Sequence, residues 1–280
     1  MVRGVARPCW SPITWKRARA SRRMSRSCAP DGSCISRRVQ AAVLSRWARS
    51  TAMPLPDLLR HSWSVAAKDL LVEFRSRTAI LSVAVFVVLV LVVFNFGRDP
   101  TAVSNVDLAP SILWVTFTFA AILALNRAFQ LELENQALDG LLLAPIDRSS
   151  IYLGKLVANL VFVATIELIG VPLLALFFNV RVLPYLGPLA ALIALATVGF
   201  VAVGTLFSAM TVRTRFAELL LPVLLLPFMI PPLSWAVLAT GRLLAGRPLS
   251  EIVGWLNMLA VYDIVFVALA LLLFPATVNE

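Results

Sequence analysis

The sequence predicts an all-α membrane protein that crosses the bilayer six times. Hydrophobic residues make up 60% of the 280 residues and charged residues only 14%, whereas a soluble domain is about 45–50% apolar and about 25% charged. The mean hydropathy is +0.86. Six apolar runs approach or exceed the roughly 20 residues that a helix needs to cross a bilayer. These runs are continuous instead of alternating, which excludes a membrane β-barrel.

Residues 1–52 read as a basic tail outside the folded domain, which we place at residues 53–280. Residues 1–77 hold 16 of the 25 Lys and Arg residues and only four of the 15 acids. The tail has no apolar core for a cleavable signal peptide, although its Arg-rich and Ser-rich composition is similar to an organellar transit peptide. We favour the alternative that translation starts at Met53. In either case the tail cannot bury enough apolar surface to fold.

Metal, haem-ligand and nucleic-acid sites are not expected. The cysteines Cys9, Cys28 and Cys34 all lie in the tail without a CxxC pair, and His61 is the only histidine. Neither a zinc site nor haem ligation by paired histidines fits this inventory. The arginines of the tail come with no nucleic-acid-binding motif, so we expect no nucleic-acid partner.

The first element of the domain, at residues 55–77, is expected to be an amphipathic helix at the membrane surface, because its apolar residues recur at helical spacing. The six spans follow at residues 79–96, 108–125, 156–180, 186–210, 219–238 and 253–274. With the N-terminus inside, the inner flanks of the spans carry nine Lys or Arg residues and the outer loops four. The positive-inside rule therefore predicts that both termini are cytoplasmic.

Two spans have unusual compositions. The fifth contains Pro222, Pro227, Pro231 and Pro232, and each internal proline removes a helical hydrogen bond. We expect this helix to break at about Pro231, with residues 233–252 forming short outer or re-entrant pieces. The fourth span is rich in Ala and Gly, which predicts close helix packing, with a dimer contact as an alternative.

Two carboxyl groups fall within spans, Glu167 in the third and Asp263 in the sixth. An intramembrane carboxylate costs roughly 2.5–3.5 kcal/mol on insertion scales and usually faces a bundle interior or a cavity. Such a group has two possible roles. The functional role is in a substrate path or a proton relay. The structural role is that of a protonated acid hydrogen-bonded to a neighbouring helix. We favour the structural interpretation for both residues.

The segment between the second and third spans is the most informative one. At about residues 131–144 it predicts a cytoplasmic amphipathic helix, with leucines on one face and polar residues on the other. Gly140 interrupts this helix, and Pro145 with Asp147 ends it and starts the next one. Its two interpretations are a surface anchor and a docking element for a soluble partner.

This segment resembles the interface helix of ABC-2-type exporters, in which acidic residues, paired leucines and a proline recur. The corresponding residues here are Glu132, Glu134, Asp139, Leu141, Leu142 and Pro145. In detail, the segment most closely resembles the CcmB family, the haem exporter membrane subunit of cytochrome c maturation. Residues 68–79 and 206–232 also resemble this family, and the resemblance covers roughly Leu58 to the C-terminus. The tail before Met53 has no counterpart in it.

The resemblance implies an ABC-2-type exporter fold and a homodimeric permease in the bacterial inner membrane. It also implies three kinds of partner: a separate ATPase that binds the ATP, haem-handling membrane subunits, and haem as the transported substrate. The chain itself is not expected to hydrolyse ATP, because its only Gly-Lys pair, Gly154-Lys155, lacks the other residues of a P-loop. The alternatives are an ABC-2 permease for a lipid, polysaccharide or drug, and an ion-coupled carrier that uses Glu167 and Asp263 as its relay.

Overall fold

The computed structural model describes residues 55–76, 78–99, 101, 104–134, 147–211, 214 and 216–277. The predicted tail at residues 1–52 lies outside these residues. Throughout the described part the chain is helical apart from short connections, and it contains no strand. The elements are α3 (Leu55–Ser76), α4 (Thr78–Gly97), α5 (Asn105–Glu134), α7 (Arg148–Phe178), the 3₁₀ turn η1 (Leu183–Tyr185), α8 (Leu186–Thr211), α9 (Ala217–Leu244) and α10 (Ser250–Thr277).

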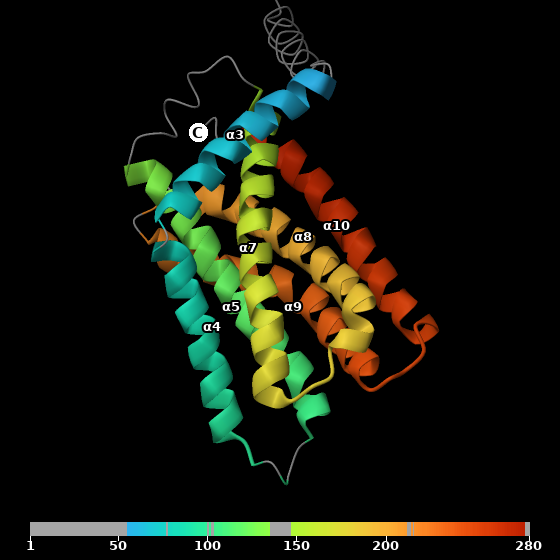
Figure 1. The fold of residues 1–280 in the computed structure, drawn as a ribbon. Coiled ribbons are helices and arrows are strands. Elements are labelled where there is room, and N and C mark those ends of the chain that lie inside the picture. The colour runs from blue at the N-terminus through green and yellow to red at the C-terminus, as the bar shows by residue number, and fades with distance from the viewer. Residues whose placement is uncertain are drawn as a thin grey trace, which may run out of the picture. The chain divides into compact units, whose positions relative to one another are not determined.

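Six of these helices, α4, α5, α7, α8, α9 and α10, are long and apolar enough to cross a membrane. This confirms the predicted all-α protein with six spans. Successive spans run in opposite directions through the bundle, as Figure 1 shows. The start of α7 and the end of α10 lie together: Arg148 of α7 donates a hydrogen bond to the carbonyl of Pro275 of α10 at 3.3 Å. We call this the α3 end of the bundle, since α3 also lies there (Figure 1).

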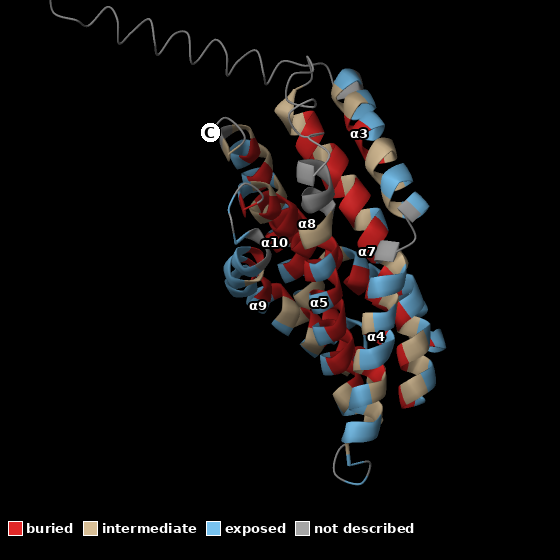
Figure 2. Cartoon of the chain, turned by 90° about the vertical axis from the view of Figure 1, so that its left-hand side faces the viewer, coloured by how far each residue is buried: buried red, intermediate tan, exposed pale blue. Residues whose placement is uncertain are grey.

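Helices α5 and α8 occupy the centre of the bundle. In the most apolar stretch of each helix, 72% of α5 and 67% of α8 is buried, whereas only 17% of α4 is buried. In α8, every residue from 199 to 206 is buried, so neighbouring helices surround this stretch on all sides. Figure 2 shows many buried residues on these two helices and also on α7, whereas α4 and α9 carry exposed faces.

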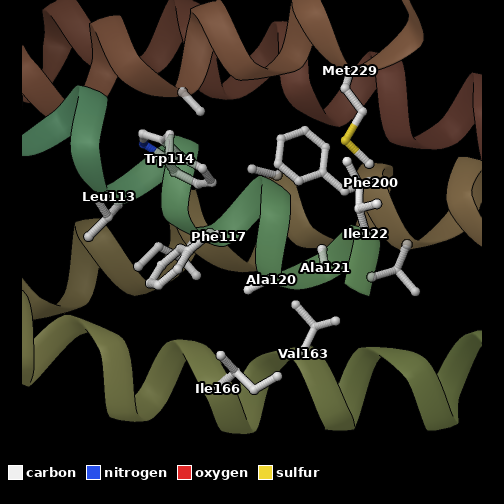
Figure 3. Close-up of a cluster of buried hydrophobic side chains, with 14 of the residues drawn as sticks. Leu113, Trp114, Phe117, Ala120, Ala121, Ile122, Val163, Ile166, Phe200 and Met229 are labelled. Atoms are coloured by element: carbon white, nitrogen blue, oxygen red, sulfur yellow. The ribbon is translucent and has the colours of Figure 1, made fainter. Parts of the chain in front are cut away.

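The centre of the core is an aromatic cluster built around Trp114 of α5 (Figure 3). The Trp114 ring meets Phe117 of the same helix and Phe200 of α8 edge to face, each at 6.2 Å between ring centroids. Its indole Nε1 donates a hydrogen bond to the hydroxyl of Thr240 on α9 at 2.9 Å. One side chain thus joins α5 to α8 by packing and to α9 by a hydrogen bond.

The predicted break in the fifth span is wrong. Helix α9 runs without interruption from Ala217 to Leu244 with all four prolines inside it. Residues 233–244, expected as outer or re-entrant pieces, continue the same helix, and α10 begins soon afterwards at Ser250.

Another helix supplies a hydrogen bond to one of the carbonyls that these prolines leave free. Pro232 has no N–H, so it cannot donate to the carbonyl of Phe228 four residues earlier. The hydroxyl of Tyr262 on α10 donates to that same carbonyl at 2.7 Å. A proline is tolerated inside a transmembrane helix when a neighbouring side chain satisfies the carbonyl that the proline leaves free.

We predict that Tyr262→Phe destabilises the bundle by about 1–3 kcal/mol, because it leaves a carbonyl acceptor unsatisfied. Thermal unfolding of the purified protein in detergent measures the effect. The matched control is Ser234→Ala, which removes an exposed hydroxyl that donates to the carbonyl of Pro231 at 2.8 Å. That carbonyl still has the helical N–H of Trp235 as a donor. Equal losses from the two substitutions would contradict this account of α9.

Candidate functional site

The predicted docking segment begins as a direct extension of α5. This helix has 30 residues and is therefore about 45 Å long, which exceeds the roughly 30 Å hydrocarbon core. The apolar part of α5 ends at Arg127, and residues 128–134 continue the helix at the α3 end. Glu132 and Glu134 lie in this extension, in the last turn of α5.

The other residues predicted for the ATPase interface, Asp139, Leu141, Leu142 and Pro145, lie outside the described residues. The chain is described again from Asp147, and α7 begins at Arg148. The segment is therefore anchored on both sides by transmembrane helices, α5 before it and α7 after it.

Within the described residues, ion pairs at the α3 end involve the α3 carboxylates of Asp69 and Glu73. Asp69 pairs with Lys68 of its own helix at 2.9 Å and with Lys155 of α7 at 3.5 Å. Glu73 pairs with Arg127 of α5 at 3.9 Å. Because the Lys155 side chain is only 3% exposed, its ion pair is shielded from water and from salt. These pairs tie α3 to both helices that flank the docking segment.

Close packing adds to these links between α3 and α7. Ser62, Val65 and Ala66 of α3 are buried. A Cβ atom at Gly154 of α7 would lie 2.7 Å from the Ser62 carbonyl oxygen and 2.6 Å from the Val65 Cβ. Only glycine allows the two helices to come this close, so Gly154 and Lys155 together fix α3 on α7.

The helix predicted for residues 55–77 is confirmed over Leu55–Ser76, but its apolar residues divide into two groups. One side of α3 packs on α7, and large apolar side chains on the rest of the helix are exposed: Leu59, Trp63, Leu71, Val72 and Phe74. These exposed residues are the ones available to a lipid headgroup boundary, so the membrane-surface position of α3 stays a prediction.

The electrostatics of this region are not simple charge pairing. Burial raises the pKa of the Glu73 carboxyl above its ordinary value, and the negative charge of Asp69 adds to the shift, whereas the Arg127 guanidinium opposes it. The stability that Glu73 contributes as a neutral acid is therefore lost as the pH rises through its folded-state pKa.

The two intramembrane carboxyl groups lie against different faces of α8. Glu167 of α7 accepts a hydrogen bond from the hydroxyl of Thr197 at 2.5 Å. Asp263 of α10 lies beside Gly199, where a Cβ atom would be 2.6 Å from Asp263 Oδ1. Thr197 and Gly199 are two residues apart and so point about 200° apart around the helix. The structure does not bring Glu167 and Asp263 together as a relay pair.

The structural interpretation fares differently for the two acids. The expected hydrogen bond to a neighbouring helix is present for Glu167. For Asp263 that expectation is wrong for the part of the chain that the structure describes, where neither of its buried carboxyl oxygens has a hydrogen-bond partner. Within the described residues, no group of three His, Cys, Asp or Glu side chains could hold a metal ion.

Sequence reasoning missed a polar cluster at the opposite end of the bundle. Arg98 donates to the side chain of Asn105 and lies over the Phe178 ring, 5.5 Å from its centroid. The Asn105 amide then donates to the Phe178 carbonyl at 2.6 Å. The cluster joins the end of α4, the start of α5 and the end of α7. In the sequence, Arg98 served only as one of the four basic residues of the outer loops. No sequence signal indicated that it would contact Asn105 and Phe178.

We predict that Asp69 and Lys155 are energetically coupled. A double-mutant cycle of Asp69→Asn and Lys155→Met should give a coupling energy above about 1 kcal/mol, within the range for residues in contact. The matched control is the pair Arg242 and Glu251, 3.7 Å apart with side chains 45% and 38% exposed. An exposed pair is typically worth about 0.2–1 kcal/mol. Unfolding measurements that give the buried pair no larger coupling would contradict its role in fixing α3.

Comparison with known proteins agrees with this architecture. Residues 60–280 match the family described as CcmB protein. A heme exporter protein B of Rhodobacter capsulatus is 32% identical over 153 residues, which are 55% of this chain and 69% of that protein. The heme exporter protein B of Pseudomonas aeruginosa is 29% identical over 214 residues, 75% of this chain and 90% of the relative. That of Escherichia coli is 30% identical over 184 residues, 63% and 80% of the two chains. The family match includes most of α3 and all six spans, so the chain belongs to the CcmB family.

Proposed function

We propose that this chain is the membrane permease subunit of an ABC-type exporter that delivers haem for c-type cytochrome biogenesis. The observation that carries the proposal is the match to the CcmB family over residues 60–280. The relatives named heme exporter protein B support haem as the transported substrate. Six apolar helices, one of which (α8) is buried along residues 199–206, suit a permease.

A separate ATPase subunit supplies the energy in this proposal. The chain's Gly154-Lys155 pair stands inside α7, where both residues already have structural roles against α3. A P-loop needs its glycines and lysine in a loop that cradles phosphate groups. The position of this pair in a packed helix supports the assignment of ATP hydrolysis to a partner.

The docking site for that ATPase is the segment at residues 131–144. The carboxylates of Glu132, Glu134 and Asp139 suit basic side chains or backbone N–H donors on the partner. The sequence pattern predicts that Leu141 and Leu142 hold the segment to the ends of the spans and that Pro145 ends it. Movement imposed on Glu132 and Glu134 passes directly into α5, because both residues belong to that helix. The ion pairs of Arg127 and Lys155 then carry it to α3 and α7.

The remaining partners follow from the same assignment. The permease acts as a homodimer in the bacterial inner membrane, together with haem-handling membrane subunits. The exposed apolar side chains of α4, α9 and α10 provide surface for lipid and for a second copy. Both termini face the cytoplasm, which agrees with the excess of Lys and Arg on the flanks of that side.

We predict that cells lacking this chain fail to assemble c-type cytochromes, and that the full chain restores them. Asp139→Arg should fail to restore them and should retain less ATPase on the tagged permease, because it reverses a charge in the interface. Truncations at buried contacts cost about 1 kcal/mol or more, so a charge reversal should reduce retention at least about fivefold. Leu141→Asp should act in the same way by detaching the segment from the membrane domain.

The control is Asp107→Arg, because Asp107 is an exposed residue in the first turn of α5, at the opposite end from the docking segment. It should behave like the parent in ATPase retention at equal membrane expression. If Asp139→Arg retains as much ATPase as the parent, the docking site lies elsewhere. Suppose that the deletion strain makes normal c-type cytochromes, and that in a separate experiment the ATPase co-purifies with the tagged parent permease. The haem assignment is then wrong and the ABC class stands.

A further inference from the structure

Asp263 is a carboxyl group in the middle of the membrane that the proposed function does not use. It is the fourteenth residue of α10, so it lies about 20 Å along the helix, near the middle of a roughly 30 Å hydrocarbon core. Only 6% of the residue is exposed. Water therefore has little access to this carboxyl group from the surface of the bundle.

Among the described residues, no side chain or backbone group donates a hydrogen bond to this carboxyl group. Both Oδ1 and Oδ2 are buried and lack a partner. The nearest hydroxyl in sequence, that of Tyr262, is directed to the Phe228 carbonyl of α9. On the α8 side the carboxyl group meets Gly199, which has no side chain to donate. The glycine leaves the space that the carboxyl group occupies, because a Cβ atom there would lie 2.6 Å from Oδ1.

The titratable groups on the helices packed against α10 are engaged elsewhere. On α7, Glu167 is bonded to Thr197 on the other face of α8, and Lys155 pairs with Asp69. Also on α7, Arg148 donates to the Pro275 carbonyl at the end of α10, twelve residues beyond Asp263, and the Tyr152 hydroxyl donates to the Ala202 carbonyl. On α9, Arg242 pairs with Glu251 near the start of α10. Tyr262 is the one titratable neighbour in contact with the same glycine. Within the described residues, no cation is paired with Asp263.

We propose that Asp263 is a proton-binding site inside the membrane, occupied by a proton in this arrangement of α8 and α10. An ionised carboxylate buried without a donor or a cation costs far more than its neutral acid, so the group retains its proton. The step is a simple dissociation, in which the acid O–H bond gives a carboxylate and a free proton. Release requires that water or a donor reaches the carboxyl group, which happens when α10 moves away from Gly199. Proton occupancy of Asp263 is thereby linked to the packing of α10 on α8.

Infrared spectroscopy of the full chain in lipid vesicles at neutral pH tests this directly. An un-ionised carboxylic acid has a carbonyl stretching band that an ionised carboxylate lacks. The parent-minus-variant spectrum for Asp263→Asn should show the loss of one such band. Asp107→Asn, which replaces an exposed aspartate on α5, should show no loss. If Asp263→Asn leaves the un-ionised band unchanged, the carboxyl group is ionised and the proposal is overturned.

A second measurement needs no variant and decides the question if Asp263→Asn does not fold. A membrane-permeant carbodiimide reacts with un-ionised carboxyl groups: the acid proton moves to a carbodiimide nitrogen and the carboxyl oxygen bonds to the central carbon. Peptide mass spectrometry of the treated parent should find the adduct on Asp263 and not on Asp107. In that case, absence of the adduct from Asp263 would overturn the proposal. Neither measurement depends on the ATPase or on haem, so a negative result leaves the proposed function untouched.

Discussion

The close approach of neighbouring helices to α8 is the constraint on which the rest of the bundle depends. Water drives apolar surfaces together in soluble proteins, but lipid tails are as apolar as leucine and provide no such force. Helices in a bilayer must instead gain contact by approaching closely. Gly204 of α8 receives the Leu125 side chain of α5, and Gly199 receives Asp263 and Tyr262 of α10. These small residues explain how one helix is surrounded along residues 199–206.

Once α8 is enclosed, hydrogen bonds between helices fix its register. Asn159 of α7 donates to the Thr205 hydroxyl at 3.1 Å, and Ser208 donates to the Leu125 carbonyl at 3.1 Å. Tyr152 of α7 donates to the Ala202 carbonyl at 3.0 Å. In a medium without water each such group needs a protein partner. The ends of the bundle are held differently, by ion pairs at α3 and by the Arg98 cluster at the other end.

The sequence was sufficient for the spans because hydropathy depends on local composition, and each apolar run is long enough to cross the bilayer by itself. It was insufficient wherever a partner came from another helix. The prolines of α9 suggested a break because Tyr262, which donates to the Phe228 carbonyl that Pro232 leaves free, lies 34 residues from Phe228 in the sequence. The sequence did not indicate that Lys155 of α7 pairs with Asp69 of α3. It also did not indicate that Asp263 has no hydrogen-bond donor among the described residues. Part of the docking segment could be placed, since Glu132 and Glu134 continue α5, and its role stays a prediction.

The most direct test of this account is the thermal stability of two variants that carry the same substitution at different points of α8. Gly204→Leu forces a large side chain against Leu125 in the enclosed part of the helix, whereas Gly187→Leu adds it where nothing lies within 4 Å. Overpacking of a core typically costs about 1–3 kcal/mol, occasionally more. We therefore expect Gly204→Leu to lower the melting temperature of the purified protein clearly and Gly187→Leu to leave it close to that of the parent. Equal melting temperatures for the two variants would contradict the central role of close approach to α8.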